Sequence, residues 1–350
     1  MESGDVDKRT TIYDIAARLG ISTATVNRAL TGKPYVKDET RELVLKTAAE
    51  MGFKPNALAR SLARRKLRLA VVGFTNFTEF HGQFLNGARE AGEALQDFNV
   101  SVDYFSYDHN ASETMQETDG ILESMLQHVV DGGYDGALVL ARSARTFQTL
   151  RDRGIVVGTA VNDIDEGLRR FHVCYNGFVA GRIAAEMIYH WMPDASRPVA
   201  VASGWANQQI HNTTVRGFQE QARRMPLNIR SVYYNQEDTQ IAYESTCRLL
   251  ETCPELGAIY VNSFNSSGVI RAVLEHGLGG RVVLVTSDLN AELREHIASG
   301  VVAASIFQNQ YEQGRIGLHT LYNVLANDGE VSNVVAIDPR VIISSNLELF

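Results

Sequence analysis

The fold of the N-terminal region is decided by Thr11-Ile-Tyr-Asp-Ile-Ala-Ala-Arg-Leu-Gly20 and the following Ile21-Ser-Thr-Ala-Thr-Val-Asn-Arg-Ala-Leu30. Thr11 and Asp14 have the spacing of a helix-starting capping box, and Gly20 is suited to ending a short helix. Ser22 is a favourable cap for a second helix that runs to about Leu30. Two short helices joined by a tight glycine turn form a helix-turn-helix.

The second of these helices has an outward face that is suited to reading DNA bases. Its side chains follow an i, i+1, i+4, i+5 spacing, which makes them neighbours: Thr23, Ala24, Asn27 and Arg28. Arg28 can donate two hydrogen bonds to guanine, Asn27 can pair with adenine, and the methyls of Thr23 and Ala24 can contact a thymine methyl. The alternative is an ordinary solvent-facing surface of a helical hairpin.

Two further segments complete the N-terminal region. A third helix is predicted from about Lys37 to Met51, and the next run, 56–64, is a helix former too short to be stable alone. Such a segment can fold on docking, with Leu62 wedged into a minor-groove base step and Arg60 and Arg64 near phosphates. A plain linker leucine is the alternative for Leu62.

The net charge changes sign along the chain. Residues 1–68 hold fourteen Lys and Arg against eight Asp and Glu, whereas the remainder holds nineteen against thirty-three. A basic region joined to an acidic body is typical of a protein that binds a polyanion at one end, because Lys and Arg on phosphates release counterions. A mildly basic, solvated surface would give the same counts.

The N-terminal segments 11–30, 35–41 and 52–62 are together similar to the DNA-binding headpiece and hinge of the lactose-repressor (LacI) family, without a gap from Thr11 to Leu62. The resemblance implies that Thr23, Ala24 and Arg28 contact the major groove, that Thr11, Ser22 and Thr25 contact the phosphate backbone, and that Leu62 contacts the minor groove. Two residues depart from the family pattern: Asn27 replaces a usual Ser, and Lys37 replaces the usual Ser cap. The candidate DNA-binding residues are Thr11, Tyr13, Ser22, Thr23, Ala24, Thr25, Asn27, Arg28, Asn56, Ala59, Arg60 and Leu62.

From Leu67 onward, short β-branched runs alternate with helical stretches, which predicts parallel sheets flanked by helices. The runs are 69–73, 137–140, 155–158, 199–202, 258–261 and 282–285. The fold class expected is a small all-α helix-turn-helix domain with a hinge helix, followed by a two-lobed α/β domain with two parallel sheets. The expected bounds are 1–55 for the headpiece, 56–66 for the hinge and 67–350 for the body, with lobes at 67–165 plus 303–327 and 166–302 plus 328–350.

Ligands of parallel α/β sheets bind beyond the carboxyl ends of the strands, so the polar residues there are candidates for an effector site. Amides and carboxylates can bind paired hydroxyls while an aromatic ring covers an apolar face, which suits a sugar-like effector. Each of these residues could instead be a loop cap. The candidates are Asn76, Phe77, Phe80, Asp163, Trp205, Thr214, Arg216, Asn262, Asp288 and Gln308.

The body is similar to the periplasmic-binding-protein-like effector domain of the same family, which implies a sugar site containing Asp288, Asn262 and Gln308. Two departures bear on the effector class. Thr214 stands where many relatives have a ligand-clamping Arg, with Arg216 as a possible substitute, and Tyr175 replaces an acid.

Other function classes are disfavoured by the motifs. The chain has no lysine after Lys66, and hence no phosphate-binding Gly-Lys loop in the body, and no Gly-x-Ser-x-Gly or His-Glu-x-x-His sequence, which disfavours an enzyme. Cys174, Cys247 and Cys253 lack ligand or disulfide spacing. We expect no cofactor, no metal and no membrane span, a cytoplasmic location, and not a transport receptor or a sugar-binding protein without DNA regulation.

The expected mechanism is that of an allosteric regulator, most simply a repressor. A homodimer would bind a palindromic operator in double-stranded DNA, since one headpiece buries too little surface for specificity. A small polar effector, a sugar or a sugar derivative, would close the lobes and alter the spacing of the two hinges.

Overall fold

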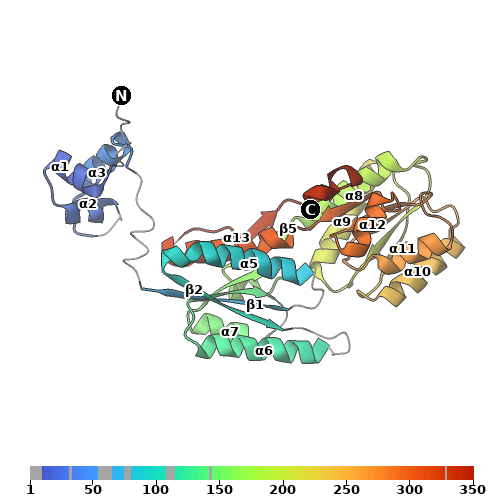
Figure 1. Cartoon of the computed structure of the whole chain (residues 1–350), viewed down its shortest axis with the longest axis horizontal. Coiled ribbons are helices and arrows are strands. Elements are labelled where there is room, and N and C mark those ends of the chain that lie inside the picture. Colours follow the sequence, from blue (N-terminus) through green and yellow to red (C-terminus); the bar gives the residue numbers. More distant parts are fainter. Residues whose placement is uncertain are drawn as a thin grey trace, which may run out of the picture. The chain divides into compact units, whose positions relative to one another are not determined.

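The computed structural model describes residues 10–30, 34–53, 65–74, 80–107, 115–141, 144–327 and 329–350. The chain divides into two compact units, Met1–Arg64 and Arg65–Phe350, which are considered separately below (Figure 1). Seven residues predicted to contact DNA or effector lie outside the described residues: Asn56, Ala59, Arg60, Leu62, Arg64, Asn76 and Phe77.

The first unit is a bundle of three helices, α1 (Ile12–Leu19), α2 (Thr23–Leu30) and α3 (Asp38–Glu50). The predicted capping box is present, since Thr11 Oγ1 accepts from the Asp14 N–H and the Asp14 carboxylate accepts from the Thr11 N–H. Gly20 ends α1 in the left-handed conformation at φ 65°. The small apolar core between the helices consists of Ile15, Ala16, Val26, Ala29, Val44 and Ala48, and Thr47 of α3 is buried as well.

The body contains a first sheet whose strand order is β11-β5-β4-β3-β1-β2 and whose neighbours are all parallel. Alternate residues of β1 point to opposite faces, as the two-residue period of a strand requires. Leu69 and Val71 pack against α5 and α13, while Ala70 and Val72 pack against α6 and α7. The strands are β1 (Leu67–Phe74), β2 (Val100–Tyr107), β3 (Gly136–Leu140), β4 (Val156–Ala160), β5 (Phe171–Tyr175) and β11 (Val334–Ile337), and the helices are α5 (Gly82–Leu95), α6 (Met115–Asp131), α7 (Thr146–Asp152) and α13 (Gln310–Asn327).

The second sheet has the order β12-β10-β9-β8-β6-β7, and it is parallel except for the antiparallel pair β10 and β12. Helices α8 and α9 cover one face, and α10, α11 and α12 cover the other. The elements are β6 (Val199–Ser203), β7 (Ile229–Tyr234), β8 (Ala258–Val261), β9 (Val283–Ser287), β10 (Ala304–Phe307) and β12 (Arg340–Ile342), with α8 (Gly177–Trp191), α9 (Gln209–Arg224), α10 (Thr239–Thr252), α11 (Ser267–Glu275) and α12 (Ala291–Ala298).

The two-sheet α/β fold class is confirmed, but the lobe bounds differ from the predicted ones. Strand β5 was assigned to the second lobe and pairs with β4 of the first sheet, while β10 was assigned to the first lobe and pairs with β9 of the second. Strand β11 also belongs to the first sheet. The chain therefore passes between the sheets after β5, after β10 and after β11. The predicted bounds failed because strand pairing, rather than order along the chain, decides sheet membership.

Candidate nucleic-acid interface and effector site

Helix α2 presents the side chains that the sequence indicates as base-reading. Ala24, Asn27 and Arg28 are exposed, and Thr23 is half-buried at the start of the helix. Val26 and Ala29, on the opposite face, are buried in the headpiece core. The packing thus holds this outward face of α2 rigidly while leaving its polar groups accessible to a partner.

The residues predicted to contact the DNA backbone lie at helix starts. The Ser22 hydroxyl accepts from the Thr25 N–H at 3.1 Å, and the Ser22 and Thr25 hydroxyls lie 2.9 Å apart. Thr11 is exposed at the start of α1, and the Tyr13 side chain is 71% exposed. Helix N-termini orient N–H groups outward, which suits contact with phosphate.

In the body, Asp288 and Gln308 lie together at adjoining strand ends, with Asp288 following β9 and Gln308 following β10. The Asp288 carboxylate accepts from the Gln308 side chain at 2.7 Å, from the Gln310 side chain at 2.6 Å and from the Gln308 N–H at 3.2 Å. Burial nevertheless raises the pKa of Asp288 to about 7, against the lowering effect of these bonds. Through its hydrogen bonds with Gln308 and Gln310, Asp288 holds in place the segment that joins β10 to α13, where the chain returns to the first sheet.

A second cluster at this end of the sheet includes two residues that the sequence did not single out, His211 and Glu237. The Trp205 N–H donates to His211 Nδ1 at 2.8 Å, and His211 Nε2 faces Glu237 Oε1 at 3.4 Å. The Asn262 side-chain nitrogen donates to the His211 carbonyl at 3.2 Å. Trp205, through its backbone N–H, and Asn262, through its side chain, thus both contact His211. Glu237 follows β7, and recognising that strand would have brought it into the candidate set.

Asp163 lies in a different network, at the end of β4 in the first sheet. Arg169 donates to both of its carboxylate oxygens, at 2.5 and 2.6 Å. Burial favours the neutral acid, but the Arg169 bonds and the nearby His172 hold the pKa of Asp163 below its usual range. Arg169 also donates to the carbonyl of Asn333 at 2.8 Å. Asp163 therefore forms an internal ion pair with Arg169, and Arg169 connects this loop to the segment before β11.

The two residues considered in place of a clamping Arg are not equivalent. Thr214 is fully buried, and its hydroxyl lies 2.9 Å from the Tyr175 hydroxyl. Arg216 is exposed on α9, and its guanidinium reaches only Thr213 of the same helix, at 3.5 Å. The structure does not bring Arg216 to Asp288 or Asn262, so it does not take the place of the missing Arg.

Phe80, which precedes α5 on the side of the first sheet, contacts Phe264, which follows β8 of the second. Their ring centroids are 5.8 Å apart, and the rings are nearly perpendicular at 74°. Edge-to-face pairs at this distance are favourable. The contact joins the two lobes next to Asn262.

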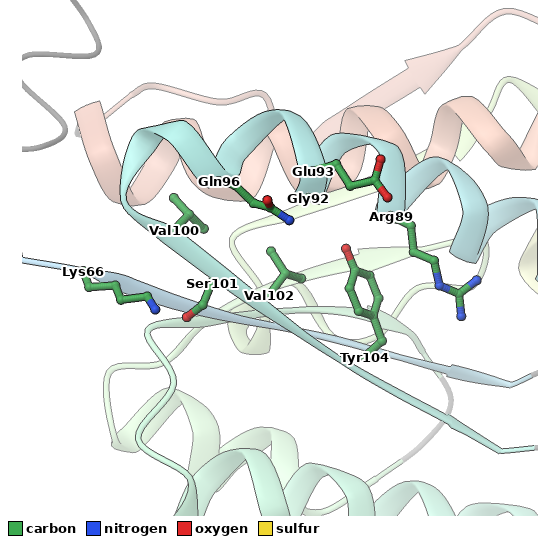
Figure 2. A pocket seen from close by; sticks show the side chains of 9 residues that line it. All are labelled: Lys66, Arg89, Gly92, Glu93, Gln96, Val100, Ser101, Val102 and Tyr104. Carbon is green, nitrogen blue, oxygen red and sulfur yellow. The ribbon is translucent and has the colours of Figure 1, made fainter.

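A cavity of about 460 Å³ lies elsewhere, between the edge strand β2 and helix α5 (Figure 2). Its wall uses the first residues of β2, so it is at the opposite end of the strand from the carboxyl terminus where effectors bind. We therefore do not assign the effector to it. It is lined by Lys66, Arg89, Gly92, Glu93, Gln96, Val100, Ser101, Val102 and Tyr104.

Among the described residues, no helix combines the length and apolar character needed to cross a membrane. The same part of the chain has no group of three His, Cys, Asp or Glu side chains placed to hold a metal ion.

The body of the protein was compared with known families first, and its match defines the class of protein. Residues 69–330 match the family described as "Periplasmic binding protein domain". A solved arabinose binding protein, AraP from Geobacillus stearothermophilus, has a similar fold with a TM-score of 0.70, at 20% identity over 81% of this chain and 99% of that one. The body is thus a two-lobed binding domain.

The headpiece and full-length relatives specify the family. Residues 11–56 match "Bacterial regulatory proteins, lacI family". Catabolite control protein A of Priestia megaterium is 23% identical over 347 residues, covering 95% of this chain and 97% of that protein. The HTH-type transcriptional regulator AscG of Escherichia coli (strain K12) is 39% identical over 77 residues, 22% of this chain and 23% of that protein.

The chain therefore belongs, through residues 69–330, to the periplasmic binding protein domain family, and residues 11–56 form a DNA-binding domain of the lacI type, the arrangement of a DNA-binding regulator. The relatives compared are regulators and a binding protein, so the alternative of an enzyme is rejected.

Proposed function

We propose that the protein acts in the cytoplasm as a homodimeric repressor that binds a palindromic operator and is controlled by a sugar-like effector. The observation that carries the DNA half of this proposal is the exposed face of α2, Ala24, Asn27 and Arg28, held by a packed apolar core. These side chains match the hydrogen-bonding and methyl groups of the major groove. One headpiece reads few base pairs, so two identical headpieces on a two-fold site supply the specificity.

The proposed dimer contact uses the open edge of the first sheet. Strand β2 is the last strand of that sheet, and none of the described strands pairs with its outer side. The adjoining α5 presents Arg89 and Glu93 to solvent beside Tyr104 of β2 (Figure 2). An unpaired edge is a ready template for a second chain. Lys66, which follows the hinge segment, lines the same cavity as Arg89, Glu93 and Tyr104, so a partner at this surface would set the separation of the two hinges.

The effector half of the proposal rests on the second sheet's strand ends and on the relatives' chemistry. AraP, which shares the fold, is an arabinose binding protein. Amides and carboxyls gather where parallel α/β sheets bind ligands, with Phe80 and Phe264 joining the lobes beside them. Effector binding between the lobes would change their closure and hence hinge spacing, and a coupling of about 1–3 kcal/mol would change operator occupancy severalfold.

Selection of duplexes from a random pool by the full-length protein tests this proposal. We expect two-fold symmetric sequences, two chains per duplex, and an affinity that falls by orders of magnitude between about 50 and 200 mM salt. A bound sugar should change that affinity. Selection of asymmetric sites by single chains, or binding that ignores salt, would contradict the proposal.

A further inference from the structure

The carboxyl end of the second sheet contains no positively charged side chain. All residues that follow its parallel strands are described, and 203–208, 235–238, 262–266, 288–290 and 308–310 contain neither Lys nor Arg. They do contain three acids, of which Asp238 is used to cap α10 through the Ile241 N–H at 2.8 Å. The partly buried Glu237 and the buried Asp288 remain in this group, each with the pKa raised to about 7.

His211 does not supply the missing positive charge. Its Nδ1 accepts from the Trp205 N–H, so a neutral ring carries its single proton on Nε2, which faces Glu237. Burial lowers the pKa of His211 to about 4, so the ring is neutral at physiological pH. The imidazole and the Glu237 carboxyl also close over Gly204, where an added Cβ would lie 2.2 Å from His211 and 2.3 Å from Glu237. The pair is thus a packed part of the site.

Two buried oxygens here have no hydrogen-bond donor among the described residues: Glu237 Oε2 and Asn262 Oδ1. The Asn262 amide oxygen can only accept a hydrogen bond, and the same holds for the Glu237 oxygen when the carboxyl group is ionised. The Asn262 side-chain nitrogen already donates to the His211 carbonyl, which fixes the amide so that its oxygen is the unpaired atom. The hydroxyl of Ser203, at the end of β6, is unpaired as well, and it can donate a hydrogen bond as well as accept one. Asn262 is 1% exposed and Ser203 is fully buried. Each unpaired buried acceptor costs about 1–3 kcal/mol, so a donor that arrives there is strongly favoured.

From these unpaired acceptors and the absence of cations in the described strand-end segments of the second sheet, we propose that this sheet selects an effector by a hydrogen-bond-donor group, an amine in preference to a hydroxyl, and excludes a carboxylate or phosphate. This rests on the proposed sugar effector and specifies its charge. A hydroxyl can donate to Glu237 or Asn262, and an ammonium can in addition offset the buried acids. An anionic group can donate nothing to these oxygens and would lie beside Glu237 and Asp288 without a counter-charge.

Matched sugars test the proposal on the full-length protein at pH 8, where Glu237 is largely ionised. Calorimetry would compare each aldohexose with its 2-amino-2-deoxy form, its uronate and its 6-phosphate, in the gluco, galacto and manno series. We expect the uronate and phosphate to bind at least about tenfold more weakly than the aldose, and the amine to bind as well as the aldose or better. An anion that binds as tightly as its aldose, or failure of every sugar to bind, would overturn the proposal.

Substitutions assign the selectivity to the named atoms. Glu237→Gln keeps the shape and removes the charge, so the ratio of aldose to uronate affinity should fall about fivefold or more, whereas Glu251→Gln, on the exposed side of α10, should leave it unchanged. Asn262→Ala should weaken the aldose and the amine together. An unchanged ratio in Glu237→Gln would overturn the assignment. Selective sugar binding that leaves operator affinity unaltered would contradict the proposed function while leaving this inference intact.

Discussion

The outward face of α2 and the carboxyl end of the second sheet are both polar surfaces built on apolar cores, but they hold their polar groups differently. Asn27 and Arg28 are exposed to water. Asp288 and Asn262 are 1% exposed, and the Asn262 oxygen is unpaired among the described residues. Water satisfies the exposed groups until a partner replaces it, whereas the buried ones carry a desolvation penalty in the folded chain. Substitutions should therefore change binding specificity in the headpiece and stability in the body.

Replacing Arg28 with alanine should give the largest effect and should act on binding alone. Each lost bidentate contact to guanine costs about 1–3 kcal/mol, and a dimer loses two, so preference for a selected duplex over a scrambled one should fall at least about thirtyfold. The melting temperature should hardly change, because the side chain is exposed. Titration of both duplexes at fixed salt measures the ratio.

Arg18→Ala removes the same charge from the exposed surface of α1 and is the matched control for Arg28→Ala. It should weaken both duplexes by a similar factor, since a general electrostatic contribution is independent of sequence. If Arg28→Ala also weakened both duplexes equally, Arg28 would contact phosphate rather than bases.

The headpiece could be predicted in detail because its signals are local. Thr11, Asp14 and Gly20 specify one helix through bonds spanning three or four residues, and the structure contains each of those bonds. The exposed face of α2 follows from helical periodicity once Val26 is placed inward. The structure adds the burial of Ala29 and of Thr47 to the predicted pattern.

The effector site was predicted less completely because its contacts join distant segments. His211 and Glu237 come from the first turn of α9 and the loop after β7, and no local spacing relates them. Arg216 was considered as a substitute for the ligand-clamping Arg whose place Thr214 takes. Each residue of an α-helix is turned by about 100° from the one before it, so Thr214 and Arg216, two positions apart, point in different directions. Gly217 packs against the Phe178 carbonyl of α8, and Thr214 faces Tyr175, which leaves Arg216 toward solvent.

Glu237→Gln should make the stability of the body less dependent on pH. Burial raises the pKa of Glu237 from 4.5 to about 7 in the folded chain, so ionisation is less favourable there than in the unfolded chain. The wild-type protein therefore loses stability as pH rises from about 4.5 through 7, and the loss is complete above that range. The variant should equal the wild type near pH 5 and exceed it by about 1–3 kcal/mol at pH 8.

Chemical denaturation at the two pH values measures the effect of Glu237→Gln. Asp288 also has its pKa raised to about 7, so the variant should retain part of the decline. Glu251→Gln should follow the wild-type curve at every pH. A stability gain for Glu237→Gln that is the same at pH 5 and pH 8 would show that packing, not charge, is responsible.

The smallest expected effect is that of Ser22→Ala, which tests whether a polar group of the headpiece contributes to stability at all. The Ser22 hydroxyl accepts from the Thr25 N–H at 3.1 Å, and loss of such a cap costs about 1 kcal/mol. Amides of α2 should then exchange with solvent about fivefold faster in the full chain, while amides of α9 stay unchanged. Ser22→Asp retains an accepting oxygen at the cap and should restore slow exchange. Equal exchange in Ser22→Ala and the wild type would mean that packing of Val26 and Ala29 holds α2 without this cap, and the headpiece would then differ from the body even more sharply, because the exposed Ser22 hydroxyl would contribute nothing to its fold.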